Sequence, residues 1–472
     1  MRFPGQLFFL AVLLSVVAGC QNFRPQPLSS ATAALSFELR TLGPPDLKSF
    51  LEKNLNTNFA TWPVKSWDFP ALTMVAFYYH PSLDVARAQW AVSEGGVRTA
   101  NARPNPTVSI SPEYNFSAAR AVSPWLAGFS FDLPIETARK RGYRTARARY
   151  LSEAARLNIG AVAWQVRKNL RDGLIGLDAA QKGVALLQRQ KELQTRMVEI
   201  LDLQLKAGAI APFEISTAHL ALNKLQLDLG TAQSQKVEAF SRVAEALGLP
   251  VSALAEIDLL PNELTVGDLS SPEVRRSALQ NRSDILSALA EYAASQSALQ
   301  LEIAKQYPDL HLGTGYQYVQ GDNKWSLVGL SLELPLLNRN QGGIAEAKAR
   351  REEAAAKFVA LQAKVIAEID RALAIHRATE DQLKMGASLL ETQHLRHESV
   401  EAQFKAGAIE RLDFLTTEVE LGAIEVLQLD TQTKAARALS DLEFAVQRPL
   451  ALPQTMLTET EKNPRPEKEH SP

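Results

Sequence analysis

An internal duplication constrains the fold of this 472-residue chain more than any other feature of its sequence. The segment Lys-Ala-Gly-Ala-Ile at residues 206–210 recurs unchanged at residues 405–409. Further matched pairs lie upstream of the two copies in one order, at an offset between 199 and 202 residues: Trp125 and Trp325, Gly128 and Gly329, Leu133 and Leu334, Pro106 and Pro308, and Ala86 and Ala288. A merely Ala-rich helical sequence would not repeat Trp, Gly and Pro in register. The chain is therefore predicted to contain two copies of one supersecondary unit.

Each unit is predicted to run helix, two strands, very long helix, turn and helix, which makes the fold mostly α. Proline is absent from residues 135–211 and from residues 336–448, and both stretches are rich in strong helix formers. A helix over residues 136–205 would be roughly 100 Å long, so it must pack in a bundle or tube of similar helices. Apolar residues along it keep the three-four spacing of a coiled-coil seam: Leu170, Leu174, Leu177, Val184, Leu193, Met197 and Ile200.

The repeated Lys-Ala-Gly-Ala-Ile segments are predicted to end the two long helices. Gly208 and Gly407 suit left-handed C-terminal caps, and Pro212 suits the first turn of the helix that follows. The returning helices are expected to end near Leu247 and Val446. The two turns comprise Ala207, Gly208, Ala209 and Ile210 in the first copy, and Ala406, Gly407, Ala408 and Ile409 in the second.

Four segments alternate apolar and polar residues with the period of a β-strand. Each is about 9–11 residues long, the length of a tilted membrane strand. The side chains expected to face the membrane include Val108, Ile110, Phe129, Phe131, Leu310, Leu312, Leu330 and Leu332. Aromatic residues gather near the outer ends, as an interfacial girdle requires: Tyr114, Phe116, Trp125, Tyr316, Tyr318 and Trp325. A half-buried soluble sheet would also fit this alternation.

Two hairpins in one chain cannot close a barrel. Four strands leave two open edges, and a lipid environment does not tolerate unpaired backbone groups. A membrane location therefore requires several copies of the chain, and three copies would supply about twelve strands, within the range of outer-membrane barrels. The predicted fold class is an internally duplicated long-helix α-barrel with two β-hairpins per chain and a transmembrane β-barrel completed by trimerisation.

The N-terminus has the pattern of a bacterial export signal. Arg2 precedes an apolar run over residues 7–17, and Val17-Ala18-Gly19-Cys20 resembles a lipobox. That resemblance implies cleavage before Cys20 and covalent lipid on its thiol and amine, with no other cofactor expected. An ordinary secretory signal is the alternative, although Cys20 is the only cysteine in the chain. Glutamine at position 21 favours the outer membrane as the destination.

The predicted domains follow from the repeat, with residues 1–19 as the signal peptide and 20–70 as a lipid-anchored segment. The first repeat takes residues 71–249 with a β-hairpin at 106–134, the connector takes 250–281, and the second repeat takes 282–450 with a β-hairpin at 308–335. Residues 451–472 form a polar tail that is expected to be disordered. The chain has 51 Lys and Arg against 52 Asp and Glu, so no basic excess argues for nucleic acid as a partner.

The chain resembles the TolC-like outer-membrane efflux proteins over nearly its whole mature length. The resemblance lies in the paired hairpins that open with Pro-Asn-Pro-Thr-Val and Tyr-Pro-Asp-Leu-His-Leu and close in Leu-Pro, in the long helices, and in the glycine turns. It implies a homotrimer in the outer membrane of a Gram-negative bacterium, extending into the periplasm. It also implies a passive exit duct of a tripartite system for small molecules, drugs or metal ions, with a periplasmic adaptor at the helix turns and an inner-membrane pump.

The resemblance also implies candidate gate residues. Asp413 stands at the position of a gate aspartate, six residues after the turn glycine Gly407, and Glu214 is its repeat partner. Thr416 stands where some members of the family have a second aspartate. A ring of such carboxylates around a threefold axis would select cations. The alternative is that Asp413 and Glu214 are solvated acids in the first turns of their helices, where the helix dipole favours them.

Other chemistry is weakly represented in the sequence. His394, His397 and Glu398 have helical spacing but no third fixed ligand, so a solvated face is favoured over a metal site. A basic run after the first hairpin is predicted to meet lipid phosphates or simply solvent: Arg139, Lys140, Arg141, Arg144 and Arg147. No catalytic triad, carboxylate pair or phosphate loop is found, so an enzyme is not expected. A lipid-anchored periplasmic coiled-coil scaffold without a pore is the alternative to a duct.

Overall fold

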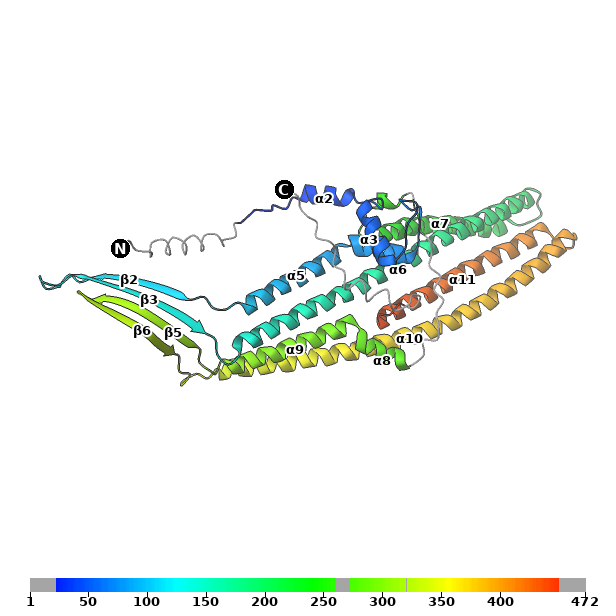
Figure 1. The fold of residues 1–472 in the computed structure, drawn as a ribbon. Coiled ribbons are helices and arrows are strands. Elements are labelled where there is room, and N and C mark those ends of the chain that lie inside the picture. Colours follow the sequence, from blue (N-terminus) through cyan, green and yellow to red (C-terminus); the bar gives the residue numbers. More distant parts are fainter. Residues whose placement is uncertain (1–22, 256, 260–271, 320, 450–472) are drawn as a thin grey trace. The chain divides into compact units, whose positions relative to one another are not determined.

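The computed structural model describes residues 23–255, 257–259, 272–319 and 321–449 (Figure 1). The predicted signal peptide, Cys20 and the tail at 451–472 lie outside the described residues. The chain divides into two compact units, Met1–Thr41 and Leu42–Pro472. In the smaller unit, helix α2 (Ser30–Glu38) is capped by Ser29, whose hydroxyl accepts the Thr32 N–H at 3.4 Å. The following paragraphs concern the larger unit.

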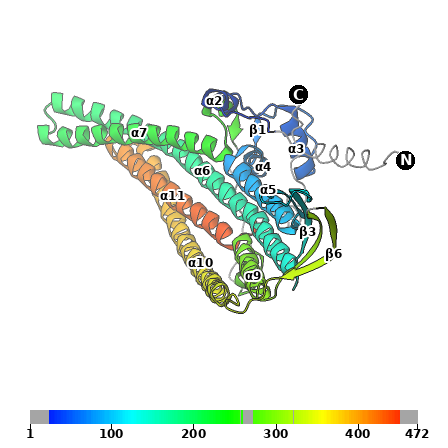
Figure 2. The ribbon, with the colours of Figure 1, turned by 90° about the vertical axis from the view of Figure 1, so that its left-hand side faces the viewer.

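The two repeats have the predicted order of elements. The first consists of α5 (Pro81–Asn101), β2 (Thr107–Tyr114), β3 (Trp125–Ile135), α6 (Lys140–Lys206) and α7 (Pro212–Leu247). The second consists of α9 (Ser283–Ala304), β5 (Leu310–Val319), β6 (Asp322–Leu332), α10 (Gln341–Lys405) and α11 (Arg411–Val446). In each repeat the long helix packs along the returning helix, as Figure 2 shows for α6 with α7 and for α10 with α11.

Shorter elements precede and join the repeats. The N-terminal part contributes α3 (Pro45–Leu55), β1 (Ser66–Trp67) and α4 (Phe69–Tyr79), and the connector contributes η1 (Val251–Leu254), β4 (Asp258–Leu259) and α8 (Pro272–Asn281). Strands β1 and β4 pair in parallel, with Ser66 opposite Asp258. The segment predicted as a connector therefore contains a helix of its own, α8.

The long helices begin after left-handed residues, which the sequence did not reveal. The first was expected to start near residue 136, but Ala138 and Arg139 have φ values of 50° and 59°, and α6 starts at Lys140. Asn340, with φ of 60°, precedes α10 in the same way. These conformations redirect the chain from strand to helix, so the helix cannot begin earlier.

Both long helices end in the same capping motif. The Gly208 N–H donates to the Leu205 carbonyl at 2.9 Å, and the Ala209 N–H donates to the Gln204 carbonyl at 2.9 Å. The second copy repeats both hydrogen bonds at the end of α10, and Gly208 and Gly407 have φ values of 70° and 73°. This is the Schellman arrangement that the glycines predict.

The four longer strands form one antiparallel sheet in the order β2-β3-β5-β6. Strand β3 of the first repeat pairs with β5 of the second, so the sheet unites the two repeats and leaves β2 and β6 as its edges. Pro112 lies in β2, where an edge strand tolerates the missing N–H. Among the described helices, none has an apolar stretch of the length that a bilayer-crossing helix needs.

A bulge in β6 changes the predicted alternation. Gly313 pairs with Gly329, whereas Gly315 pairs with Ser326, so β6 carries one extra residue between these pairs. Strict alternation would place Trp325 on the face of Gly329. The bulge instead sets Trp325 opposite Tyr316, on the face that holds Leu330.

The core of the unit lies where the N-terminal helices cover the first repeat. Leu47, Leu72, Leu170, Val243 and Leu247 are fully buried there, and each such side chain contributes about 1.5–3 kcal/mol through burial. A second cluster joins α8 and α9 to α10 and α11 through residues that include Ile285, Val365, Ile369 and Leu442.

The coiled-coil seam is confirmed near the core and shifted near the turn. Leu170, Leu174, Leu177 and Leu193 are buried, but Val184, Met197 and Ile200 are only half-buried. Val198 and Leu201 take the buried positions instead, because Ile215 and Ala218 of α7 pack against that side of α6.

Candidate functional site

The two helix turns present the repeated sequence at the surface. Ala207, Gly208 and Ala209 are exposed, as are Ala406, Gly407 and Ala408, while Ile210 and Ile409 are half-buried. A Cβ atom added at Gly208 or Gly407 would meet nothing within 4 Å. Glycine is therefore required at both positions for the left-handed backbone and not for lack of space.

The predicted gate residues lie in the first turns after these caps. Asp413 is exposed in the first turn of α11. The Glu214 carboxylate accepts the Ala211 N–H at 3.3 Å, which caps α7. The Thr416 hydroxyl donates to the Leu412 carbonyl at 2.9 Å, so it is engaged by its own helix. Of these three side chains, Asp413 is the one for which the described residues show no side-chain hydrogen bond.

A small apolar cluster holds the two turns together. Leu412 of the second repeat packs against Val198, Leu201, Ile215 and Ala218 of the first. The structure thereby brings the start of α11, with Asp413, beside the hairpin of α6 and α7. Both copies of the turn lie at one end of the unit as a result.

Aromatic rings stack beside the second turn, a contact that was not predicted from the sequence. The rings of Phe404 and Phe414 stack at 5.1 Å with an angle of 6° between their planes, and His397 lies 5.6 Å from Phe414. The repeat alignment pairs these two phenylalanines with Leu205 and Ile215. That paired change from aliphatic to aromatic residues was the available signal.

One face of the sheet is apolar and exposed. Val108, Ile110, Leu330 and Leu332 are 54%, 73%, 59% and 41% exposed, and Phe129 is 44% exposed. Phe131, Leu310 and Leu312 belong to the same rows of cross-strand neighbours. All eight side chains predicted to face the membrane therefore share one face of the sheet.

Aromatic pairs mark one end of this apolar face. The rings of Tyr114 and Trp125 lie 5.0 Å apart, and those of Tyr316 and Trp325 lie 4.7 Å apart. Trp125 and Trp325 are 57% and 69% exposed. Large exposed aromatic residues at a strand end are typical of a membrane–water interface.

The opposite face is polar and built largely from small residues. It holds Ser109, Ser111, Gly128, Ser130, Gly313, Gly315, Gly329 and Ser331 in its cross-strand rows. A Cβ atom at Gly128 would lie 2.8 Å from the Ser111 Oγ atom. Near the helices on this face, the His311 Nδ1 atom lies 2.9 Å from the Asp132 carboxylate.

Two members of the basic run are used inside the protein. The Lys140 ammonium lies 2.8 Å from the Asp309 carboxylate and donates to the Tyr307 carbonyl at 2.7 Å. The Arg144 guanidinium binds both carboxylate oxygens of Glu136 at 2.5 and 3.1 Å. The prediction that the whole run meets lipid or solvent is therefore wrong for Lys140 and Arg144, because both fix the junction between strands and helices.

A buried cluster of charges joins α6 to α11. Arg167, Arg171 and Glu443 are 3%, 4% and 3% exposed. The Glu443 carboxylate lies 2.8 Å from Arg167 and 3.0 Å from Arg171, and both guanidinium groups lie within 4.6 Å of the centre of the Phe69 ring. Burial lowers the pKa of the Arg171 guanidinium to about 10. This cluster was not predictable from the sequence, because Arg167 and Glu443 are 276 residues apart.

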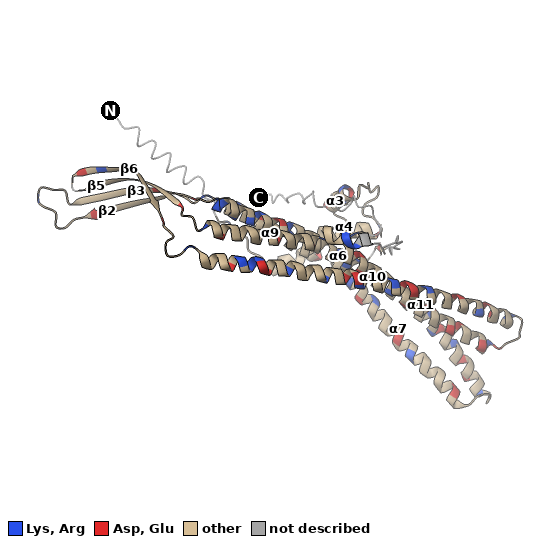
Figure 3. Cartoon of the chain, turned by 90° about the horizontal axis from the view of Figure 1, so that it is seen from below, with Lys and Arg blue, Asp and Glu red and all other residues tan. Residues whose placement is uncertain are grey.

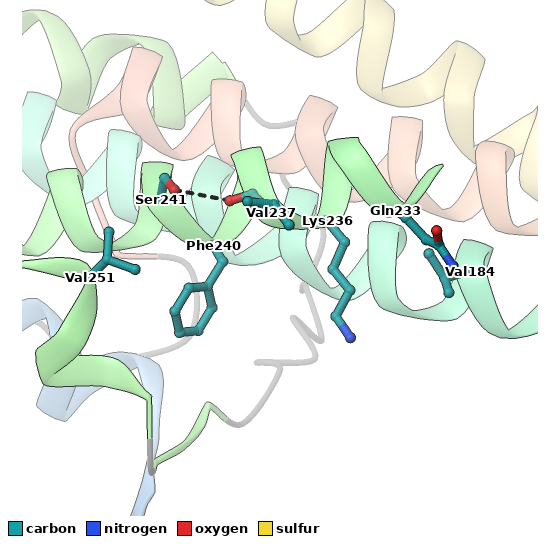
Figure 4. Close-up of a pocket in the computed structure, with 7 residues that line it drawn as sticks. All are labelled: Val184, Gln233, Lys236, Val237, Phe240, Ser241 and Val251. Atoms are coloured by element: carbon teal, nitrogen blue, oxygen red, sulfur yellow. Dashed lines mark hydrogen bonds between the residues drawn. The ribbon is translucent and has the colours of Figure 1, made fainter. Parts of the chain in front are cut away.

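A pocket of about 470 Å³ lies between α6, α7 and η1 (Figure 4), and Lys236 is its one charged lining residue. The Ser241 hydroxyl there donates to the Val237 carbonyl at 3.0 Å. Within the part of the chain that the structure describes, no group of three or more His, Cys, Asp or Glu side chains is arranged to hold a metal ion.

Comparison of the sequence with known proteins points to the same kind of protein as the β-sheet and the long helices do. The family model described as "Outer membrane efflux protein" matches residues 76–249 and 274–446. The chain is 22% identical over 370 residues to the cobalt-zinc-cadmium resistance protein CzcC of Cupriavidus metallidurans, covering 77% of this chain and 85% of that protein.

Solved structures of similar fold include two described as channels. CusC matches with a TM-score of 0.67 at 17% identity, covering 83% of this chain and 95% of that chain. The outer-membrane channel OprN matches with a TM-score of 0.69 at 17% identity, covering 92% and 99% of the two chains. These likenesses confirm the predicted TolC-like fold. Because the family model also matches well over half of the sequence, the chain belongs to the outer membrane efflux protein family.

Proposed function

We propose that three copies of this chain form the outer-membrane exit channel of a tripartite efflux system. Family membership makes the chain an outer-membrane efflux channel and favours a duct over a scaffold without a pore. The proposal of a trimer is supported above all by the four-stranded sheet. The sheet has an exposed apolar face, and its edge strands β2 and β6 each have one side without a partner strand.

The open edges require partners if the apolar face meets lipid. Each unpaired backbone group in hydrocarbon costs several kcal/mol, so the edges must pair. Pairing β6 of one copy with β2 of the next would close a barrel of about twelve strands from three chains. The Gly- and Ser-rich face would then line the pore, which places many small side chains along its bore.

The helices would continue this pore into the periplasm. Three copies of the duplicated α6–α7 and α10–α11 hairpins would close an α-barrel, with Asp413 repeated three times near its end. The turns at residues 207–210 and 406–409 would present six copies of one surface, which suits an adaptor that binds in repeats. An inner-membrane pump would supply the driving force.

Covalent lipid on Cys20 would anchor each copy beside the barrel. The motif Val17-Ala18-Gly19-Cys20 supports this part of the proposal, and each buried methylene of an acyl chain contributes about 0.8 kcal/mol to membrane attachment. Intact-mass measurement of protein purified from its native membrane tests it. An unmodified N-terminus at another residue would contradict it.

Divalent transition-metal cations are the cargo class that we favour. The curated relative is named for resistance to cobalt, zinc and cadmium. A pore end with three exposed aspartates would also attract divalent cations. Cells that lack the gene should become more sensitive to these metals, and unchanged tolerance of all three would contradict this choice of cargo.

The channel itself is tested by conductance. The purified protein should run as a trimer by native mass measurement and produce discrete current steps in a planar bilayer of phosphatidylcholine. A monomer that never conducts would instead support the scaffold. Heat-denatured protein at the same concentration is the control for bilayer damage.

A further inference from the structure

We propose that the junction between the sheet and the long helices binds anionic phospholipid headgroups through the arginines that follow β3 and β6. The proposal rests on the proposed function, because it requires the apolar face of the sheet to lie in the membrane. Residues 137–152 contain no Asp or Glu and six cations: Arg139, Lys140, Arg141, Arg144, Arg147 and Arg149. Lys and Arg lie at the helix ends that adjoin the strands (Figure 3).

Internal contacts use only part of this charge. Lys140 and Arg144 are held by Asp309 and Glu136. Among the described residues, Arg139, Arg141 and Arg149 form no ion pair, and all three are exposed or half-buried. Their positive charge is therefore available to an external anion.

The surface beside these arginines is apolar. The apolar row of β6 continues past the strand end, where Leu334, Leu336 and Leu337 are 61%, 71% and 100% exposed, and Arg339 follows two residues later. Tyr307, three residues before the neighbouring strand β5, is 60% exposed. Exposed leucines and a tyrosine next to arginines suit the boundary between acyl chains and headgroups.

The short separation in sequence between the end of β3 and Arg139 also fits a position at the boundary between acyl chains and headgroups. Strand β3 ends at Ile135, and Arg139 lies four residues later at the left-handed turn into α6. The hydrogen bonds of Lys140 to Tyr307 and Asp309 hold this turn against the start of β5. The backbone of Arg139 and Arg141, on either side of Lys140, is thus held next to the end of the apolar face.

Headgroup phosphate is the anion that this chemistry recognises. A guanidinium group binds two phosphate oxygens at once, and each cation near an anionic membrane surface strengthens binding roughly fivefold. Phosphatidylglycerol combines that phosphate with a net negative charge. Phosphatidylcholine carries the same phosphate with a compensating cation, so it serves as the comparison lipid.

The experiment measures lipid binding to the full-length protein in a zwitterionic detergent. Native mass spectrometry would titrate it with phosphatidylglycerol and, separately, with phosphatidylcholine. The test variant is Arg139→Gln/Arg141→Gln/Arg149→Gln. The matched control, Arg196→Gln/Lys224→Gln/Lys236→Gln, removes three exposed cations from the α6–α7 hairpin far along the sequence from any strand.

Wild type and the control should bind phosphatidylglycerol roughly tenfold or more tightly than phosphatidylcholine, and the test variant should lose most of that preference. Equal binding of the two lipids by wild type, or an equal loss in the control, would overturn the proposal. A changed ion selectivity with unchanged lipid preference would place the arginines in the pore and would also overturn it. Wild-type conductance in phosphatidylcholine alone tests the channel separately, so the two failures are distinguishable.

Discussion

At the scale of residues, the glycines of the two helix turns show most clearly what one position requires. Gly208 and Gly407 have positive φ values and open space around them, so backbone conformation alone selects glycine there. Gly230 lies within α7, also with open space but in ordinary helical conformation. The two kinds of glycine should respond in opposite ways to the same substitution.

Gly208→Ala should destabilise the protein by about 1–2 kcal/mol, because alanine is strained in the left-handed conformation. Gly230→Ala should instead stabilise it by about 0.5–1 kcal/mol, because alanine is the better helix former. Thermal unfolding of the two variants in one detergent measures both effects. A shift of the same sign in both variants would contradict this assignment.

Glu302 should make stability depend on pH. Partial burial would raise the pKa of its carboxyl, but hydrogen bonds from Lys305 and Asn340 outweigh that effect and hold the pKa below its ordinary value. The carboxylate therefore contributes stability above its unfolded pKa, and that contribution is lost as the pH falls through the folded value. Wild type should lose more stability than Glu302→Gln between about pH 5 and about pH 3. Parallel curves would count against this role, with Glu94→Gln as an exposed control.

Asp413→Asn should reduce the cation selectivity of the channel and its block by divalent ions. Three exposed carboxylates near one axis would attract cations, and their loss removes that field. Folding should hardly change, because a first-turn acid stabilises its helix by only about 0.3–1 kcal/mol. Single-channel recording under a salt gradient measures both properties. Reversal potentials that match wild type would place Asp413 outside the pore. Glu214→Gln, which alters the first-turn acid that accepts the Ala211 N–H, is the comparison variant from the other repeat.

Residue roles were only partly predictable from the sequence. Gly208, Gly407 and Pro212 were predictable, because caps and first helical turns depend on local conformation. The roles of Lys140 and Arg144 were not, since their partners come from other elements that fold against them. Whether Asp413 faces a pore stays a prediction, because that depends on other copies of the chain.

At the scale of elements, the buried charges between α6 and α11 hold the two repeats together. Glu443 of the second repeat lies between Arg167 and Arg171 of the first, beneath Phe69 of α4. A buried carboxylate with two partners is costly to remove, because both guanidinium groups then remain buried without it.

Glu443→Gln should therefore destabilise the protein by about 3–5 kcal/mol. Arg171→Met should cost much less, because Glu443 keeps its 2.8 Å contact with Arg167 and one excess cation disappears. Glu425→Gln, which breaks a surface contact of 3.7 Å with Arg189, should cost at most about 1 kcal/mol. Denaturant unfolding ranks the three variants. Equal losses in Glu443→Gln and Glu425→Gln would refute the role of the cluster.

The order of helices and strands was predictable from the sequence, whereas the strand pairing and the start of α6 were less so. Proline-free stretches and period-two alternation located the long helices and the strands. The bulge between Gly313 and Gly315 and their partners on β6 was not visible, because it depends on cross-strand pairing. The start of α6 at Lys140 was missed for a similar reason, since the left-handed Ala138 and Arg139 carry no glycine signal.

At the scale of the whole molecule, the duplication explains why one chain carries two hairpins and two long-helix pairs. The described chain alone leaves the outer edges of β2 and β6 without a partner strand and the apolar face of its sheet exposed. Several copies of one chain satisfy both features when their edges join in a ring. The central claim is therefore that β6 of one copy pairs with β2 of the next.

Disulfide crosslinking of engineered edge cysteines tests this claim most directly. In a Cys20→Ser background, Ser109→Cys or Ser111→Cys on β2 would be combined with Gly329→Cys or Ser331→Cys on β6, all on the polar face. Oxidation in native membranes should link the copies in at least one combination into covalent dimers and trimers that reductant reverses. Single cysteine variants on either edge are the controls. Monomers alone in all four combinations, from protein that is folded in the membrane, would contradict a barrel closed by three copies.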